Sequence, residues 1–293
     1  MNSKNEYDLK SINSPFRWAG GKFYARKIIE KYIPKHDFYV EPFLGGGSVF
    51  FHKNKVNSWL NDYEKDLINC YKVIKSNLSD LLDKLKNEKA TKERHRWFKN
   101  EFSPKTKIEQ AFKYYYLNRT SYSGIMKREN CFFGYGEKYS MRPENWPRQL
   151  EKNSKKLQKV KITNFDFEKV INNIKTKNTF VFLDPPYFNA DQNKFYTKSF
   201  GVQDHIRLCK ILKKNNNKFK FLLTYDNCEE IREMYKWAKF SDSQEWNYVI
   251  ARTDNQKEKK KLKDGFSRPR SKGKEIFIYN YSIKDESKQL KLI

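Results

Sequence analysis

The chain has 293 residues, enough for one large domain or for a main domain with a second one inserted into it. Its 61 Lys and Arg residues against 35 Asp and Glu residues give a net charge of +26, which favours a polyanionic partner such as nucleic acid over nonspecific coating of an acidic surface. An AT-rich genome would raise the lysine content but would not lower the acid content. Neither an apolar run long enough to span a membrane nor a secretory signal occurs, so we expect a cytoplasmic protein.

The first third of the chain alternates between short apolar runs and helical patterns. These patterns predict helices at 22–33, from 48 onward and at 64–76, and strands at 38–40 and 59–61. A strand, a glycine turn, a helix and a second strand that ends in an acid form the first half of a nucleotide-binding βαβ unit.

Residues 79–158 differ in sequence pattern and composition from the segments on either side. Long charged helical patterns surround an aperiodic stretch, 121–149, which is rich in Gly, Tyr, Phe, Arg and Asn. We therefore predict an inserted, basic, mostly helical domain at 79–158, and a main α/β domain formed by 1–78 and 159–293.

The α/β pattern resumes after this insert, with strands predicted at 160–162, 180–183, 219–224 and 275–279 and a helix near 203–213. Before the last strand, the loop 251–274 has ten Lys and Arg residues against three acids. Such a composition predicts a solvated, disordered loop, and it also fits a loop that becomes ordered on a phosphate backbone.

The four cysteines are scattered and form no CxxC pair, so we expect free, mostly buried thiols of a reducing compartment. His205 and Cys209 would share one helix face, as two metal ligands do. Because no second pair would complete a site, we predict no metal.

Three short motifs carry candidate chemistry, and the first is the glycine loop in VEPFLGGGSVFF, 40–51. Glycines between a strand and a helix let a ligand approach the backbone, and Asp62, at the end of the next strand, is placed to accept hydrogen bonds from a ribose. A tight turn that packs the helix on the strand explains the same glycines equally well.

The second motif is FRWAGGK, 16–22. As part of a helix-entry turn, it would place Trp18 in the core. As a lid over a cofactor, it would stack Trp18 on an adenine or against a cation, and Lys22 would reach an anion.

The third motif, Asp184-Pro185-Pro186-Tyr187, follows an apolar strand. Two prolines end a strand, since neither donates to the ladder, so a simple turn is one explanation. The motif also suits a nucleobase amine, whose lone pair is delocalised into the ring. The Asp184 carboxylate and the Pro185 carbonyl, held rigid by Pro186, would accept from the amine hydrogens and return the lone pair to nitrogen. Tyr187 would stack on a base that has left the duplex.

In their order along the chain, FRWAGGK, the glycine loop and Asp184-Pro185-Pro186-Tyr187 resemble the motifs of the α class of DNA adenine-N6 methyltransferases, the Dam-like D12 group. The segments LNDYEKDLINCY (60–71), NFDF (164–167), LLTYDNCEEIREMY (222–235) and EIFIYNY (275–281) also resemble motifs of that group. The resemblance implies a Rossmann-like, S-adenosylmethionine-dependent methyltransferase fold with an inserted, mostly helical target-recognition domain. It implies an enzyme that methylates N6 of adenine at a specific site in duplex DNA, by base flipping and direct attack.

Residue by residue, the resemblance implies catalytic roles for Asp184, Pro185, Pro186 and Tyr187. It implies contacts to the cofactor S-adenosylmethionine from Trp18, Lys22, Phe43, Gly45, Gly47, Asp62, Asp166 and Asp184. Target recognition would lie in the insert, where NRTSYSGIMKREN (118–130) resembles the group's recognition segment, and the candidate guanine or phosphate contacts are Arg119, Lys127, Arg128 and Arg142.

Ser123 stands where the group usually has Asn, so GATC is not the assured target. Double-stranded DNA is the expected partner, and in a restriction-modification system a cognate restriction endonuclease would act separately. Two alternatives stay open: a related enzyme that methylates RNA adenine or N4 of cytosine, and a non-catalytic DNA-binding protein. Asp184 argues against the cytosine enzyme, which commonly has Ser there, and the intact motif with Lys22 argues against lost chemistry.

Overall fold

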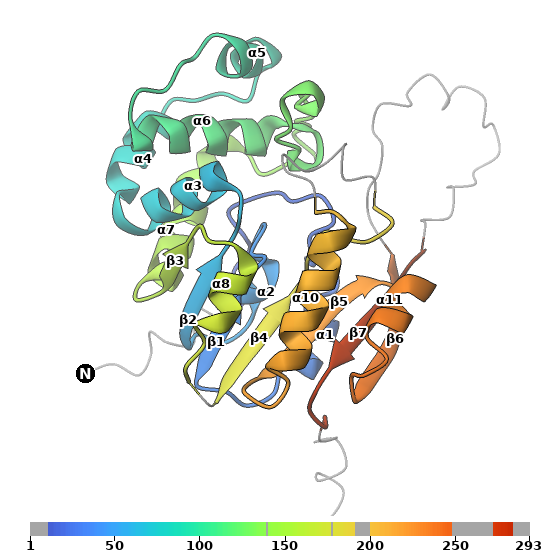
Figure 1. The fold of residues 1–293 in the computed structure, drawn as a ribbon. Coiled ribbons are helices and arrows are strands. Elements are labelled where there is room, and N and C mark those ends of the chain that lie inside the picture. Colours follow the sequence, from blue (N-terminus) through green and yellow to red (C-terminus); the bar gives the residue numbers. More distant parts are fainter. Residues whose placement is uncertain (1–10, 139, 177, 191–199, 248–271, 284–293) are drawn as a thin grey trace, which may run out of the picture.

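The computed structural model describes residues 11–138, 140–176, 178–190, 200–247 and 272–283 (Figure 1). Apart from its last three residues, the basic loop predicted at 251–274 lies outside these ranges. None of the helices within them is long and apolar enough to cross a membrane.

In the described residues, one sheet has the strand order β3-β2-β1-β4-β5-β7-β6. Its strands are β1 (Phe38–Glu41), β2 (Asn57–Asn61), β3 (Lys161–Thr163), β4 (Thr179–Leu183), β5 (Lys220–Asp226), β6 (Phe240–Asn247) and β7 (Lys272–Tyr279). Strands β1 to β5 pair in parallel, whereas β7 runs antiparallel between β5 and β6. The predicted Rossmann-like α/β fold is confirmed.

Helices cover both faces of this sheet (Figure 1). One face packs against α1 (Arg26–Tyr32), α2 (Ser48–His52) and α3 (Lys65–Ser76), and the other against α8 (Phe167–Asn172), α10 (Val202–Lys214) and α11 (Glu229–Met234). The alternation of a β-strand produces the two layers: Phe180 and Phe182 of β4 join the first core, and Val181 and Leu183 join the second.

The segment between β2 and β3 is mainly helical, as predicted. It contains α4 (Leu78–Leu85), α5 (Lys92–Asn100), α6 (Lys107–Thr120) and α7 (Trp146–Leu157), with short 3₁₀ turns at Tyr122–Gly124, Arg128–Asn130 and Pro143–Asn145. Its buried side chains, such as Tyr115 and Trp146, belong to the same core as the first face of the sheet. The predicted boundaries at 79 and 158 stay predictions.

Among the elements of the described residues, α8, α11 and β6 were not predicted. The sequence of β6 begins FSDSQE, and Ser241 and Ser243 are exposed, as expected at the edge of a sheet where apolar alternation is not required. The helix predicted at 22–33 begins only at Arg26, because residues 22–25 form turns that bring Lys22 into a pocket.

The cysteines are free, and Cys70, Cys131 and Cys209 are buried. The two candidate metal ligands on α10 have other partners: His205 Nδ1 lies 2.6 Å from the Tyr225 hydroxyl, and the Trp237 indole donates to Cys209 Sγ.

Candidate active site

The carboxyl ends of the parallel strands meet along one edge of the sheet, above the point between β1 and β4 where the strand order reverses (Figure 1). In sheets of this kind, ligands bind in the crevice at this switch point. A cavity of about 660 Å³ opens there, a size typical of cofactor sites. It is lined by all the residues predicted for catalysis and cofactor binding: Trp18, Lys22, Phe43, Gly45, Gly47, Asp62, Asp166, Asp184, Pro185, Pro186 and Tyr187.

The glycine loop forms one wall of the cavity, and Trp18 packs against it. Gly45 and Gly47 have φ angles of +47° and +68°, which L side chains rarely adopt. A Cβ on Gly45 would lie 2.7 Å from Trp18 Nε1, so the indole ring rests directly on the loop backbone. Trp18 therefore lines the cavity beside the glycines.

Asp62 holds the glycine loop in place. Its Oδ2 accepts from the Gly45 N–H at 2.7 Å and its Oδ1 from the Glu64 N–H at 2.9 Å. Burial raises the pKa of Asp62 to about 6, although these backbone N–H groups oppose the shift. Each carboxylate oxygen has a second lone pair, so Asp62 retains acceptor capacity toward the cavity.

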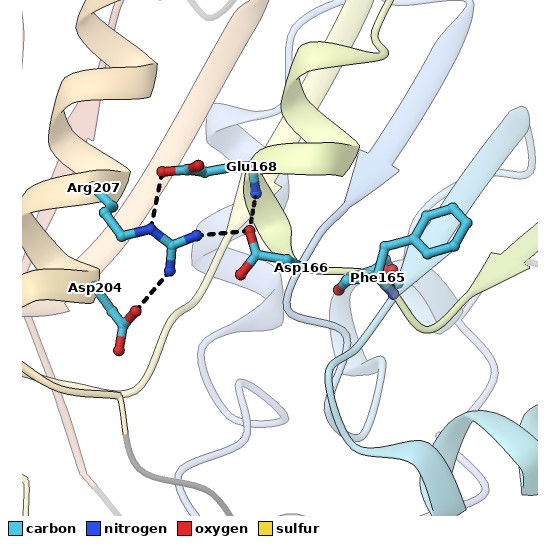
Figure 2. A network of polar contacts seen from close by, with 6 residues as sticks. Phe165, Asp166, Glu168, Asp204 and Arg207 are labelled. Atoms are coloured by element: carbon cyan, nitrogen blue, oxygen red, sulfur yellow. Dashed lines mark hydrogen bonds and ion pairs between the residues drawn. The ribbon is translucent and has the colours of Figure 1, made fainter.

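A second polar network lies at the end of β3, where Asp166 and Arg207 meet (Figure 2). Arg207 Nη2 donates to Asp166 Oδ1 at 3.0 Å, and the Glu168 N–H donates to the same oxygen at 2.9 Å. Arg207 also donates to Glu168 Oε1 and Asp204 Oδ1. Although burial lowers the pKa of Arg207, hydrogen bonds to three carboxylates raise it overall. The network fixes the Asp166 carboxylate, and its bonds to the described residues all use Oδ1.

The motif predicted to be catalytic, Asp184-Pro185-Pro186-Tyr187, begins where β4 ends. Asp184 Oδ1 lies 2.6 Å from Lys22 Nζ and accepts from the Thr224 hydroxyl at 2.8 Å. The Lys22 ammonium also lies 4.8 Å from the centre of the Tyr187 ring. Residues from three parts of the chain thus fix the carboxylate and the ring relative to each other.

Glu275, which sequence reasoning did not single out, lies beside this group. Its side chain is 1% exposed, and Oε1 is 3.8 Å from Lys22 Nζ. Burial raises the pKa of Glu275 to about 8; Lys22 and the Tyr187 hydroxyl lower it, and Asp184 and Asp226 raise it. The only signal in the sequence was the segment 275–281, which contains this acid at the start of an apolar strand.

Asp226 and His205 also support the motif; sequence reasoning missed Asp226 and considered His205 only as a possible metal ligand. Asp226 accepts from the N–H groups of Phe188 and Asn189, each at 3.0 Å, and so fixes the backbone that follows Tyr187. The Tyr187 ring packs on Tyr225, whose hydroxyl lies against His205. An acid at the carboxyl end of strand β5 was the available signal for Asp226.

The segment resembling a recognition element is attached to the FRWAGGK motif through Asn118. Asn118 Oδ1 accepts from the Arg17 N–H, and its Nδ2 donates to the carbonyls of Arg17 and Gly124. A Cβ on Gly124 would lie 2.4 Å from the Arg17 carbonyl oxygen, so only glycine permits this approach. The contact joins the helical insert to the residue next to Trp18.

The four candidate DNA contacts do not share one environment. Arg128 and Arg142 are exposed and Lys127 is half-buried. Arg119 is 7% exposed, and the Arg17 guanidinium lies nearby. Burial lowers the pKa of Arg119. Arg119 is thus buried in this conformation, and its contact with guanine or phosphate stays a prediction.

Comparison with known proteins gives a consistent result. Residues 18–252 match the family model of the D12 class N6 adenine-specific DNA methyltransferases. The type II methyltransferase M.CviBI of Paramecium bursaria Chlorella virus NC1A is 30% identical over 75% of this chain and 85% of its own. The DNA adenine methylase of Haemophilus influenzae is 27% identical over 81% of this chain and 88% of its own. A solved rRNA methylase from Streptococcus thermophilus aligns over 88% of this chain and 96% of its own at 6% identity, with a TM-score of 0.35, too low to bear on fold or function.

Proposed function

Because the chain belongs to the D12 class of N6 adenine-specific DNA methyltransferases, we propose that it transfers the methyl group of S-adenosylmethionine to N6 of an adenine flipped out of duplex DNA. The observation that most directly supports this reaction is the meeting of Asp184, Tyr187 and Lys22 in the cavity that the glycine loop lines.

The cavity fits the cofactor in size and in its donors and acceptors. Asp62, with spare lone pairs, would accept from the ribose hydroxyls, and Asp166 Oδ2 would accept from the adenine amino group. Trp18 and the glycine loop would enclose the part of the cofactor between its ribose and its adenine amino group. When bound, S-adenosylmethionine supplies an electrophilic methyl group.

The protein's task at the other end of the cavity is to hold the target amine and make its lone pair available. Lys22 and Thr224 hold Asp184 through Oδ1, which leaves Oδ2 to accept from an N6 hydrogen. The Pro185 carbonyl would accept from the second hydrogen, and Tyr187 would stack on the base. These contacts favour a tetrahedral nitrogen and therefore raise its nucleophilicity.

The insert, 79–158, is proposed as the target-recognition domain. Exposed Arg128 and Arg142 and half-buried Lys127 support contacts to guanine or to phosphate. The Asn118 contact would transmit the position of the bound DNA to the residues around Trp18.

A direct test is incubation with tritium-labelled cofactor and duplex DNA, followed by nucleoside analysis. We expect label on N6-methyladenine, with RNA of the same sequence left unlabelled. Asp184→Ala should lower the transfer rate by about 10² to 10³-fold, because a positioned acceptor at the reacting nitrogen is lost. Cofactor binding by wild type without any labelled adenine would contradict the proposal.

We also propose that the enzyme belongs to a restriction-modification system, because relatives are named type II methyltransferases. The enzyme would act in the cytoplasm, and its partner would be an endonuclease that cleaves the same site. Sequencing adenine methylation in DNA from a host that expresses the chain would identify the site. A purified endonuclease that cuts that site should then fail to cleave the methylated DNA.

A further inference from the structure

The position of Glu275 follows from the antiparallel pairing of β7 with β5. In this register Glu275 lies opposite Asp226, at the carboxyl end of β5, where the catalytic motif also lies. The neighbouring Ile276 and Phe277 face the two hydrophobic cores of the sheet, whereas Glu275 lines the cavity. A carboxylate has thus been built into the wall next to Asp184.

Packing does not account for this carboxylate. Glu275 is 1% exposed, and within the described residues neither oxygen has a hydrogen-bond partner of normal geometry. The Lys22 ammonium, 3.8 Å from Oε1, already lies 2.6 Å from Asp184. Burying a carboxyl group under these conditions is unfavourable for folding, and an apolar residue of similar size would suit the fold better.

The reaction leaves one proton to be placed. When the N–C bond forms, the methyl–sulfur electron pair stays on sulfur, and the adenine N6 carries two hydrogens and a positive charge. One hydrogen must leave to give the neutral secondary amine. If this proton stayed on Asp184, it would neutralise the carboxylate whose Oδ1 lies 2.6 Å from Lys22 Nζ.

We propose that Glu275 is the terminal acceptor of this proton, reached through Asp184 and Lys22; this inference rests on the proposed methyl transfer. Lys22 gives one of its protons to Glu275, which leaves a free lone pair on Nζ. The N6 proton passes to Asp184, and Asp184 passes it on to this lone pair of Lys22. Asp184 ends as a carboxylate, Lys22 as an ammonium and Glu275 as a neutral acid, which is reionised by solvent after product release.

The charges of the three groups suit this role. With Glu275 ionised, Asp184, Lys22 and Glu275 carry a net charge of −1 next to a nitrogen that becomes positive during the reaction. Pre-arranged negative charge in a water-poor site stabilises such a transition state. After the proton has moved, the charges of Asp184 and Lys22 cancel, and Glu275 and the methylated base are neutral.

The proposal predicts a specific pH dependence. The charged and titratable groups that face Glu275 are Lys22, Asp184, Tyr187 and Asp226. Burial, with Asp184 and Asp226, raises its pKa to about 8 against the opposing effect of Lys22 and Tyr187. Only ionised Glu275 can accept a proton, so the single-turnover rate of methyl transfer should rise with pH up to about 8 and then level off. A wild-type rate that is independent of pH from about 6 to about 9 would overturn the proposal.

Glu275→Gln keeps the side-chain volume and removes the acceptor. We expect its single-turnover rate to fall by about 10² to 10⁴-fold, with little change in cofactor or DNA affinity, and the rise with pH to disappear. Glu275→Asp should restore part of the rate together with the pH dependence. Glu88→Gln, which removes a carboxylate paired with Arg94 on the insert, is the matched control and should behave as wild type.

A measurement without cofactor or DNA tests the same carboxyl group independently of catalysis. Because the folded-state pKa is raised, Glu275 contributes stability at low pH that is lost as the pH rises from near 4.5 to about 8. The free energy of unfolding of wild type, relative to Glu275→Gln, should therefore fall across this range.

The two measurements separate the possible failures. Wild type that labels no nucleic acid overturns the proposed function, while the unfolding measurement still reports whether Glu275 holds a proton. If Glu275→Gln keeps the wild-type rate and pH profile, Glu275 is not the proton acceptor, while the proposed methyl transfer still stands. If Glu275→Gln loses cofactor affinity and stability but keeps its rate at saturating cofactor, Glu275 has a structural role. That outcome also overturns its role as proton acceptor.

Discussion

Two arginines of the insert show how the surroundings of a single residue decide its role. Arg119 and Arg128 were equal candidates for DNA contacts in the sequence. The structure encloses Arg119 and leaves Arg128 exposed. An exposed guanidinium can present its fork of donors to a guanine, whereas an enclosed one first needs a rearrangement of the protein.

Arg128→Ala should weaken discrimination at one base pair of the target site by about 1–3 kcal/mol, because a bidentate contact to guanine would be lost. The measurement is the methylation rate on a set of duplexes that differ at single positions. Arg96→Ala, an exposed arginine on α5, serves as the control and should leave the ranking of sites unchanged. An equal loss on all duplexes would identify Arg128 as a phosphate contact instead.

At the scale of an element, the glycine loop and the turn around Trp18 are built as one unit. Asp62 anchors the loop through the Gly45 N–H, and Tyr71 of α3 donates to the Gly45 carbonyl at 3.1 Å. At its far end, α2 is held by Lys156 of α7, whose ammonium donates to the Phe51 and Lys53 carbonyls. The element that lines the cavity is therefore fixed at both ends.

Gly45→Ala should destabilise the protein by about 1–3 kcal/mol, because φ is positive there and the new Cβ would lie 2.7 Å from Trp18 Nε1. The displaced indole should also weaken cofactor binding. Both effects are measurable by chemical unfolding and by calorimetric titration with S-adenosylmethionine. Gly201→Ala is the matched control, since a Cβ there meets nothing within 4 Å. If both variants lose the same stability, the close contact at Gly45 is not the cause.

At the scale of the whole molecule, the positive net charge and the arrangement of the sheet and insert both suit a protein that acts on DNA. The net charge of +26 provides attraction to DNA that does not depend on sequence, while the sheet holds the chemical groups in a cavity. The first core extends from the sheet into the helical insert, and Asn118 joins the insert to Arg17. If the insert binds DNA as proposed, this contact would fix the position of the DNA relative to the proposed cofactor residues.

DNA affinity should fall steeply with salt, because each neutralised phosphate releases counterions. If six or more phosphates are contacted, the association constant should decrease by on the order of 10³ or more between about 50 and 200 mM salt. Fluorescence anisotropy with a labelled duplex measures this slope, and titration of the cofactor on the same samples provides the control. A salt-insensitive DNA affinity would mean that the positive charge does not act through the phosphate backbone.

The sequence by itself determined where β1 to β5 and β7 lie along the chain, the loops that follow them and the chemistry of those loops. This was possible because apolar strands, glycine turns and the Asp184-Pro185-Pro186-Tyr187 motif are local patterns, and parallel strands bring their carboxyl ends to one edge. Only the tertiary structure decided which distant groups meet there. Glu275 reaches Asp184 through the antiparallel register of β7 on β5, Arg207 reaches Asp166 from another helix, and Arg119 is enclosed by its neighbours. Such contacts depend on packing between segments far apart in the chain, for which no local pattern exists.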